Sequence, residues 1–158
     1  MESLQTMIER ARAAGACDEA LRRVSSYDTV TEAMQDAEAP FWCMWYAESV
    51  IKGRWTEAEE VILRDPWASQ WYAQHVIEGR WPEAEEVIQS NPWSAYEYAI
   101  DVIKGRWPEA EEVILRNPST AYYYAKNVIG GRWPEAEEVI QSNPTAAQRY
   151  RRFLESLK

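Results

Sequence analysis

Apolar side chains recur along this chain at helical spacings, and the same spacings return several times. Tyr72, Ala73, Val76 and Ile77 stand at offsets of 0, 1, 4 and 5, which place them on one face of an α-helix. A shorter apolar set follows a polar break, and its members are Ala84, Val87 and Ile88. The pattern predicts a longer helix and a shorter helix that pack against each other through these faces.

This pattern belongs to a tandem repeat. The stretch Gly-Arg-Trp-Pro-Glu-Ala-Glu-Glu-Val-Ile is complete at three places, and a fourth copy carries Thr56 in place of the proline. The copies start at residues 53, 79, 105 and 131, a period of 26 residues. Periods of this size are typical of arrays in which short structural units stack on one another.

Local signals predict where the helices of each unit begin and end. An Asx-Pro pair, such as Asn91-Pro92, caps and starts the first helix. This helix runs for about 12 residues before a glycine, which we expect to adopt the left-handed conformation of a helix end. The second helix starts at a proline followed by glutamates. The terminating glycines are Gly53, Gly79, Gly105 and Gly131, and the starting prolines are Pro82, Pro108 and Pro134.

The sequence therefore predicts an all-α fold, an α-solenoid of stacked αα-hairpin repeats with a helical N-terminal cap. Residues 1–38 do not match the repeat and carry helical patterns of their own. A terminal unit with its own sequence is what an array needs, because its outer face meets water. The four repeats are 39–64, 65–90, 91–116 and 117–142, and residues 143–158 form a C-terminal capping helix.

Two positions beside the hairpin turn are the same in every repeat. We expect the tryptophan to fill the space at the hairpin, and the arginine before it to stack on that ring and pair with a nearby glutamate. A row of anion-binding arginines is the alternative. The Glu-Ala-Glu-Glu run is typical of a solvated helix face. The residues concerned are Arg54, Arg80, Arg106 and Arg132, with Trp55, Trp81, Trp107 and Trp133.

The variable positions of the first helix, opposite its core face, carry many aromatic side chains. Aromatic residues that point away from the hairpin core and change from unit to unit are typical of a binding surface on a solenoid. For Phe41 and its equivalents, exposure and packing against the adjacent repeat fit the pattern equally, whereas we expect the aromatic residues four positions later to be exposed. The candidate partner-binding residues are Trp45, Trp67, Trp71, Trp93 and Tyr123.

Composition and charge narrow the function. Hydrophobic residues make up 46% of the chain, enough for an ordered core. The net charge of -9 disfavours direct binding to nucleic acid or to an anionic membrane, which requires clustered Lys and Arg. The chain has no run of 18 apolar residues, so we expect a soluble cytoplasmic protein. Cys17 and Cys43 fit no metal-binding spacing and favour two reduced thiols, with a disulfide between them as the alternative.

No catalytic arrangement emerges. The single histidine, His75, occupies a variable position and is expected to be a polar surface residue. The glutamates recur without the asymmetry that would separate the pKa values of an acid and a base. Gly130-Gly131 ends a helix and does not form a phosphate-binding loop. We therefore expect a protein that is not an enzyme and has no cofactor and no metal.

One sequence resemblance adds to these observations. Val102-Ile103-Lys104-Gly105-Arg106-Trp107-Pro108-Glu109-Ala110-Glu111, followed by Ala121-Tyr122-Tyr123-Tyr124-Ala125, resembles a short tandem repeat of uncharacterised bacterial and bacteriophage proteins. The similarity covers residues 40 to about 150. It implies a helical repeat fold and is compatible with a phage origin, but it brings no activity and no site residues.

The leading hypothesis is a non-enzymatic protein–protein interaction module; in a phage, it would be an inhibitor of a host or defence protein. An acidic nucleic-acid mimic is the alternative, because residues 39–142 hold 17 acidic and 9 basic residues, a net charge of -8. With repeats stacked at ~8–10 Å, this gives one net charge per ~5 Å, against ~1.7 Å in duplex DNA. A homodimer that covers the aromatic residues is a third possibility.

Overall fold

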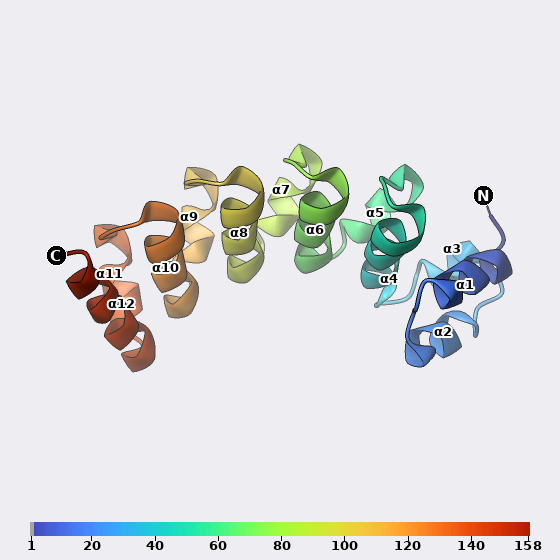
Figure 1. Cartoon of the computed structure of the whole chain (residues 1–158), viewed down its shortest axis with the longest axis horizontal. Helices are drawn as coiled ribbons and strands as arrows, with labels where there is room; N and C mark the ends of the chain where they lie inside the picture. Colours follow the sequence, from blue (N-terminus) through green and yellow to red (C-terminus); the bar gives the residue numbers. More distant parts are fainter. Residues whose placement is uncertain (1) are drawn as a thin grey trace.

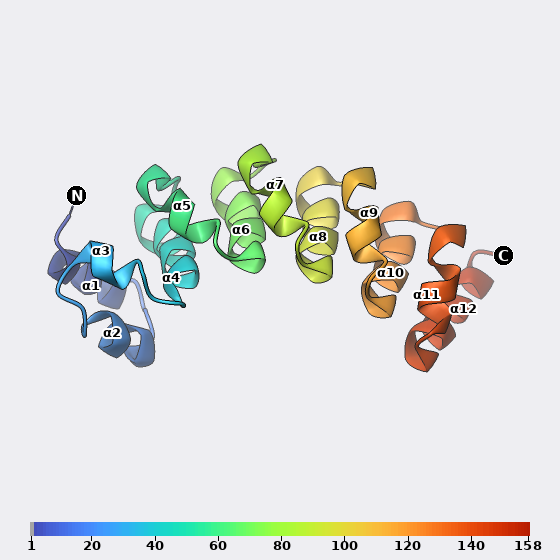
Figure 2. The same cartoon turned by 180° about the vertical axis from the view of Figure 1, so that it is seen from behind.

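The structure is a computed structural model that describes residues 2–158. Over these residues it contains twelve α-helices, short π- and 3₁₀-helical turns, and no strand, which confirms the all-α class. Helix pairs lie side by side in one curved row, with the two termini at opposite ends (Figure 1). The first helices of the repeats form one layer and the second helices form the other, seen in front in Figure 2. Each first helix packs on its own second helix and on the next first helix, as an α-solenoid requires.

The elements follow the chain in the predicted order. The N-terminal cap contains α1 (Leu4–Ala13), α2 (Asp18–Val24) and α3 (Val30–Ala33). The first helices are α4 (Ala39–Tyr46), α6 (Pro66–Tyr72), α8 (Pro92–Tyr98) and α10 (Pro118–Tyr124), which continue directly into the π-helical turns η1 (Ala47–Ile51), η3 (Ala73–Ile77), η4 (Ala99–Ile103) and η5 (Ala125–Ile129). The second helices are η2 (Thr56–Ala58) with α5 (Glu59–Ile62), α7 (Pro82–Ile88), α9 (Pro108–Ile114), and η6 (Pro134–Ala136) with α11 (Glu137–Gln141); α12 (Pro144–Ser156) follows.

The predicted Asx-Pro helix starts are confirmed. The side chain of Asn91 accepts hydrogen bonds from the amides of Trp93 and Ser94, and Pro92 occupies the first helical position. Equivalent caps start α6, α10 and α12 at Asp65, Asn117 and Asn143. These bonds satisfy amides that have no partner within the helix.

The ends of the first helices differ from our expectation. Gly53, Gly79, Gly105 and Gly131 do not adopt the left-handed conformation. In every repeat the residue before this glycine adopts it instead, and in the fourth repeat that residue is Gly130. The left-handed residues are Lys52 (φ 58°), Glu78 (φ 57°), Lys104 (φ 60°) and Gly130 (φ 72°). The reason is the wide π-helical turn, in which the amides of Lys52 and Gly53 both reach back to the carbonyl of Ala47. The turn therefore reverses one residue before the repeated glycine.

This geometry predicts that Lys104→Gly raises the free energy of unfolding by roughly 0.5–1 kcal/mol, because glycine adopts positive φ without steric strain at Cβ. Urea denaturation followed by circular dichroism measures the change. Gly105→Ala is the matched control and should shift stability by less than about 0.5 kcal/mol, since a Cβ at Gly105 meets no atom within 4 Å. A loss of stability in Lys104→Gly would contradict the claim that the positive φ of Lys104 is strained.

A buried tyrosine fastens each repeat to the one before it. The hydroxyl of Tyr98 accepts a hydrogen bond from the amide of Trp81 at 2.8 Å and donates one to Glu85 at 3.1 Å. Glu85 also receives two hydrogen bonds from the guanidinium of Arg80. The Tyr98 ring packs on Trp107 of its own repeat, with ring centroids 5.0 Å apart. We refer to this set of contacts as the tyrosine bridge.

The tyrosine bridge recurs along the array. Tyr72 and Tyr124 make the same pair of hydroxyl bonds to the preceding repeat, and Tyr150 keeps the bond from the Trp133 amide. The N-terminal cap provides equivalent groups from a different sequence: the hydroxyl of Tyr46 donates to Glu2, which pairs with Arg10 at 2.9 Å. The cap thus presents to the first repeat a carboxylate and guanidinium like those of a preceding repeat.

The repeated tryptophans and arginines are structural. Three of the four tryptophans fill the hairpins as predicted, since Trp81, Trp107 and Trp133 are only 2% exposed, whereas Trp55 of the first repeat is half-buried. Each arginine pairs with the glutamate five residues later, as in the Arg106–Glu111 pair. The predicted stacking of these arginines on tryptophan is wrong: in residues 2–158, the guanidinium–ring stacks involve Arg10 and Arg23. The guanidinium groups of the repeated arginines bind glutamate carboxylates instead.

The tyrosine bridges also predict an alkaline limit to stability. Burial raises the pKa of Tyr72, Tyr98 and Tyr124 to about 12. Unfolded tyrosine loses its proton near pH 10, so between about pH 10 and 12 the unfolded chain binds fewer protons than the native one. Stability should be unaffected by these groups below pH 10 and fall as the pH rises toward 12. Urea midpoints measured across this range test the sign, and a midpoint that stays constant or rises would contradict it.

Candidate functional site

The variable aromatic residues lie along the layer of first helices. We define the aromatic stripe as Trp45, Trp67, Trp71, Trp93 and Tyr123. Trp67 and Trp93 are 44% and 41% exposed. Trp45, Trp71 and Tyr123 are half-buried, so the expectation that they would be exposed is wrong. Trp71 contacts His75 and Glu48, and Tyr123 contacts Trp93 and Arg149, whereas Trp67 and Trp93 stand at the second position of their helices.

Rings from the first two repeats form a continuous ladder. The ring centroids of Phe41 and Trp67 are 5.7 Å apart, and Trp67 stacks on Trp71 at 5.2 Å. Trp71 stacks in turn on His75 at 4.2 Å, and its indole N–H donates to Glu48 at 3.0 Å. His75 is exposed, as predicted for a polar surface residue, and the sequence does not predict its stacking. The ladder joins the first helices of two repeats, and Trp67 is its most exposed tryptophan.

A second group of rings joins the third and fourth repeats. Trp93 lies 5.7 Å from Tyr123 and 5.9 Å from the buried Tyr96, measured between ring centroids. The Tyr96 hydroxyl accepts from Asn127 at 2.8 Å, and the Tyr123 hydroxyl accepts from Arg149 of α12 at 2.9 Å. The orientation of Trp93 is therefore supported by neighbours on two helices. The sequence pattern did not indicate Tyr96, because this position is variable and buried.

Two carboxylates separate these groups of rings. Glu97 occupies the repeat position held by Trp71 and Tyr123 in the flanking repeats, and Asp101 follows one helical turn later. Both are half-buried, and no ion pair within residues 2–158 involves either. Burial raises the pKa of Glu97, and the charge of Asp101 and a hydrogen bond with it raise that pKa further. The stripe thus contains an anionic centre without a cationic partner, which the sequence analysis did not single out.

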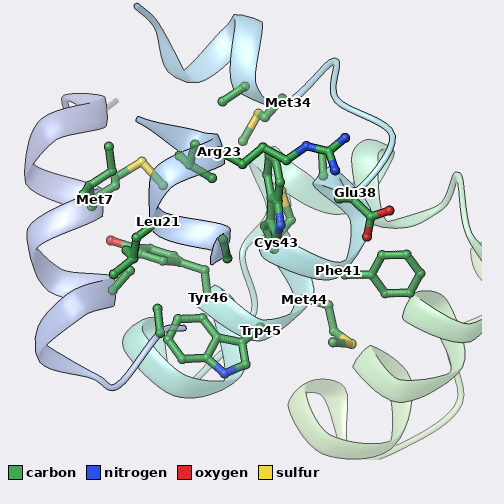
Figure 3. Close-up of a pocket in the computed structure, with 18 of the residues that line it drawn as sticks. Met7, Leu21, Arg23, Met34, Glu38, Phe41, Cys43, Met44, Trp45 and Tyr46 are labelled. Carbon is green, nitrogen blue, oxygen red and sulfur yellow. The ribbon is translucent and has the colours of Figure 1, made fainter. Parts of the chain in front are cut away.

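A cavity of about 820 Å³ opens at the N-terminal end of the stripe, between the cap and the first repeat. Figure 3 shows Met7 and Leu21 on the cap side, with Tyr46 and Trp45 of α4 across from them. Phe41, Trp45 and Trp67 also line the cavity, so it is continuous with the stripe. Most of its other lining side chains are apolar, including Ile8, Val24, Val30, Met34, Cys43 and Met44.

Of the two cysteines that line this cavity, the buried Cys43 is not a reactive centre. Cys17 and Cys43 are both free thiols, the first exposed and the second buried. Burial raises the pKa of the Cys43 thiol to about 12, so it stays protonated at neutral pH. Because the thiolate is the nucleophile and the metal ligand, Cys43 acts here as a small apolar side chain.

The second helices present a different surface. Each carries two exposed glutamates, and we refer to these eight residues as the acidic ridge. They lie on the layer seen in front in Figure 2. The glutamate between each pair is half-buried and holds the repeated arginine, so only part of the Glu-Ala-Glu-Glu run is solvated. The acidic ridge consists of Glu57, Glu60, Glu83, Glu86, Glu109, Glu112, Glu135 and Glu138.

The described part of the chain holds neither a metal-binding cluster nor a membrane-spanning helix. Within residues 2–158, no group of three or more His, Cys, Asp or Glu side chains could hold a metal ion. None of the helices in that range is long and apolar enough to cross a membrane. No protein-family model matches the chain, and comparisons with curated proteins and with solved structures give no significant match.

Proposed function

We propose that this chain is a non-enzymatic protein-binding module whose contact surface is the aromatic stripe. The observation that carries the proposal is the exposure of Trp67 and Trp93, each more than 40%, on one face of the array. Large exposed aromatic groups on a soluble domain are typical of interaction sites. Tryptophan and tyrosine are also the residues that most often dominate binding energy at protein interfaces.

The repeat array suits this role because it holds the stripe in a fixed shape. Tyrosine bridges tie each first helix to the second helix of the preceding repeat. The rings of the stripe are further held by stacking, by the hydrogen bond that Trp71 donates to Glu48 and by the one that Tyr123 accepts from Arg149. Side chains that are already ordered lose little conformational entropy on binding. The stripe therefore offers the partner apolar anchors at low entropic cost.

The sequence resemblance suggests the biological setting. The resemblance to tandem repeats of uncharacterised bacterial and bacteriophage proteins suggests a phage origin. In a phage, we propose, the chain acts in the host cytoplasm as an inhibitor of a host or defence protein. In this proposal the partner is a protein, and neither nucleic acid nor membrane is contacted directly. The inhibitor would act by occupying a surface of its target, since its own residues provide no catalytic arrangement.

An affinity capture from source-cell lysate tests the proposed surface. Three baits are compared by mass spectrometry: the wild type, Trp67→Ala/Trp93→Ala, and the ridge variant Glu83→Gln/Glu109→Gln. We expect a protein that the wild type and the ridge variant retain and the tryptophan variant loses. All baits must show the same circular dichroism. Retention of the same partner by the tryptophan variant would count against the stripe.

A second candidate function rests on the acidic ridge. Its glutamates repeat in register on the second helices. Within residues 2–158, the one ion pair that involves them is a loose one between Glu112 and Arg116 at 3.6 Å. Such a row could mimic the phosphates of a nucleic acid. In that case the ridge variant would lose the partner, and binding would weaken steeply with salt.

The homodimer is the third alternative. A wild-type bait that captures only copies of itself, together with a solution molecular mass that rises with protein concentration, would indicate it.

A further inference from the structure

Two chemically different features lie along the stripe, and together they describe the segment that would bind it. At one end lies the apolar cavity between the cap and the first repeat. Near the middle lie the carboxylates of Glu97 and Asp101. We propose that the bound segment is an extended stretch of the partner that places an apolar side chain in the cavity and a lysine or arginine between the carboxylates. This inference rests on the proposed function of the stripe and specifies its ligand.

The cavity suits an uncharged apolar side chain. Its volume, about 820 Å³, lies in the range of pockets that hold whole small molecules, so it has ample room for an apolar side chain. Met7, Met34 and Met44 line it, and flexible thioethers adapt to occupants of different shapes. The guanidinium of Arg23 at its edge is already paired with Asp36 at 2.7 Å, which leaves no free cation for an anionic ligand there.

The carboxylates suit a cation. Glu97 and Asp101 have no cationic partner in the described residues, although both are half-buried and close enough for Asp101 to raise the pKa of Glu97. By the register of the repeats, Glu97 lies between Trp71 and Tyr123, with Trp93 one turn earlier on α8. An ammonium or guanidinium group would be attracted by both carboxylates and by the faces of the surrounding rings.

The repeat spacing sets the distance between the two anchors. The cavity borders the first repeat and the carboxylates belong to the third, so they are two repeats apart. Neighbouring packed helices are separated by ~8–10 Å, which gives ~16–20 Å between the anchors. An extended chain advances about 3.3 Å per residue. The apolar residue and the cation should therefore be about five or six positions apart, with the residues between them on Trp67 and Trp71.

Synthetic peptides test this without knowledge of the partner. The probes are Gly/Ser peptides with one leucine and one arginine, either six or two positions apart, and the six-position peptide with citrulline in place of arginine. Binding is followed by NMR through the indole N–H signals of the tryptophans. We expect the six-position arginine peptide to shift the signals of Trp45, Trp71 and Trp93 and to bind at least tenfold more tightly than either other peptide.

Variants of the chain complete the test. Glu97→Gln/Asp101→Asn should remove the tenfold advantage of arginine over citrulline, whereas Glu109→Gln/Glu112→Gln on the acidic ridge should leave it unchanged. Equal binding of the arginine and citrulline peptides, or no dependence on their spacing, would overturn the inference. If the captured protein partner is lost with Trp67→Ala/Trp93→Ala but not with Glu97→Gln/Asp101→Asn, the protein-binding function stands and this assignment of the ligand fails.

Discussion

Replacing Tyr98 by alanine is expected to lower the free energy of unfolding by about 3–5 kcal/mol, the range typical of truncating a large buried aromatic side chain. Tyr98 is fully buried and links two repeats through its ring and its hydroxyl. Tyr98→Phe isolates the contribution of the hydroxyl. It should cost about 1–3 kcal/mol, because the buried amide of Trp81 and the carboxylate of Glu85 lose a partner. Urea denaturation measures both variants.

Trp67→Ala is the matched control for this series, since it removes a large ring of the stripe that is 44% exposed. Its effect on stability should stay within about 1 kcal/mol. If Tyr98→Phe is as stable as the wild type, the hydrogen bonds of the tyrosine bridge do not hold the repeats together. In that case the interface between repeats depends on the packing of the rings alone.

The second large effect concerns binding. Trp67→Ala/Trp93→Ala should weaken the affinity for the protein partner by about 30-fold or more, equivalent to about 2 kcal/mol, because truncated aromatic anchors commonly cost that much. Isothermal titration with the captured partner provides the measurement. Leu157→Ala is the control, since Leu157 is apolar and 54% exposed but lies after α12, away from the stripe. An equal loss in both variants would indicate a general effect of reduced apolar surface.

The features of this fold that depend on neighbours in sequence were predictable. Asx-Pro pairs start helices through bonds to amides two or three residues away, so Asn91 and Asn117 reveal their role in the sequence. The apolar periodicity likewise predicts the hairpin pairing and part of the core face. Tyr72 and Ala73 are fully buried, whereas Val76 and Ile77, which lie in the π-helical turn, are only half-buried. The exception is the helix end, where the π-helical turn shifts the left-handed residue to Lys104. Nothing in the residue types favours that shift, since lysine disfavours positive φ.

Features that join different repeats were not predictable. The repeated tyrosine is indistinguishable in sequence from any other core aromatic residue, yet Tyr98 bonds to groups 17 and 13 residues away. The degree of exposure along the stripe also depends on neighbours, since Tyr123 is covered by Trp93 and Arg149. The same holds for Glu97, whose importance comes from the rings that flank its repeat position and from the absence of a nearby cation.

Site-specific photocrosslinking tests the central claim, that the aromatic stripe is the protein-binding surface. A photoreactive phenylalanine analogue is placed at position 67 or 93 on the stripe, or at position 83 or 109 on the acidic ridge, and each bait is irradiated in source-cell lysate. We predict crosslinks to one protein from positions 67 and 93 and none from positions 83 and 109. Crosslinks from the ridge positions alone would contradict the claim and assign binding to the acidic face of the second helices.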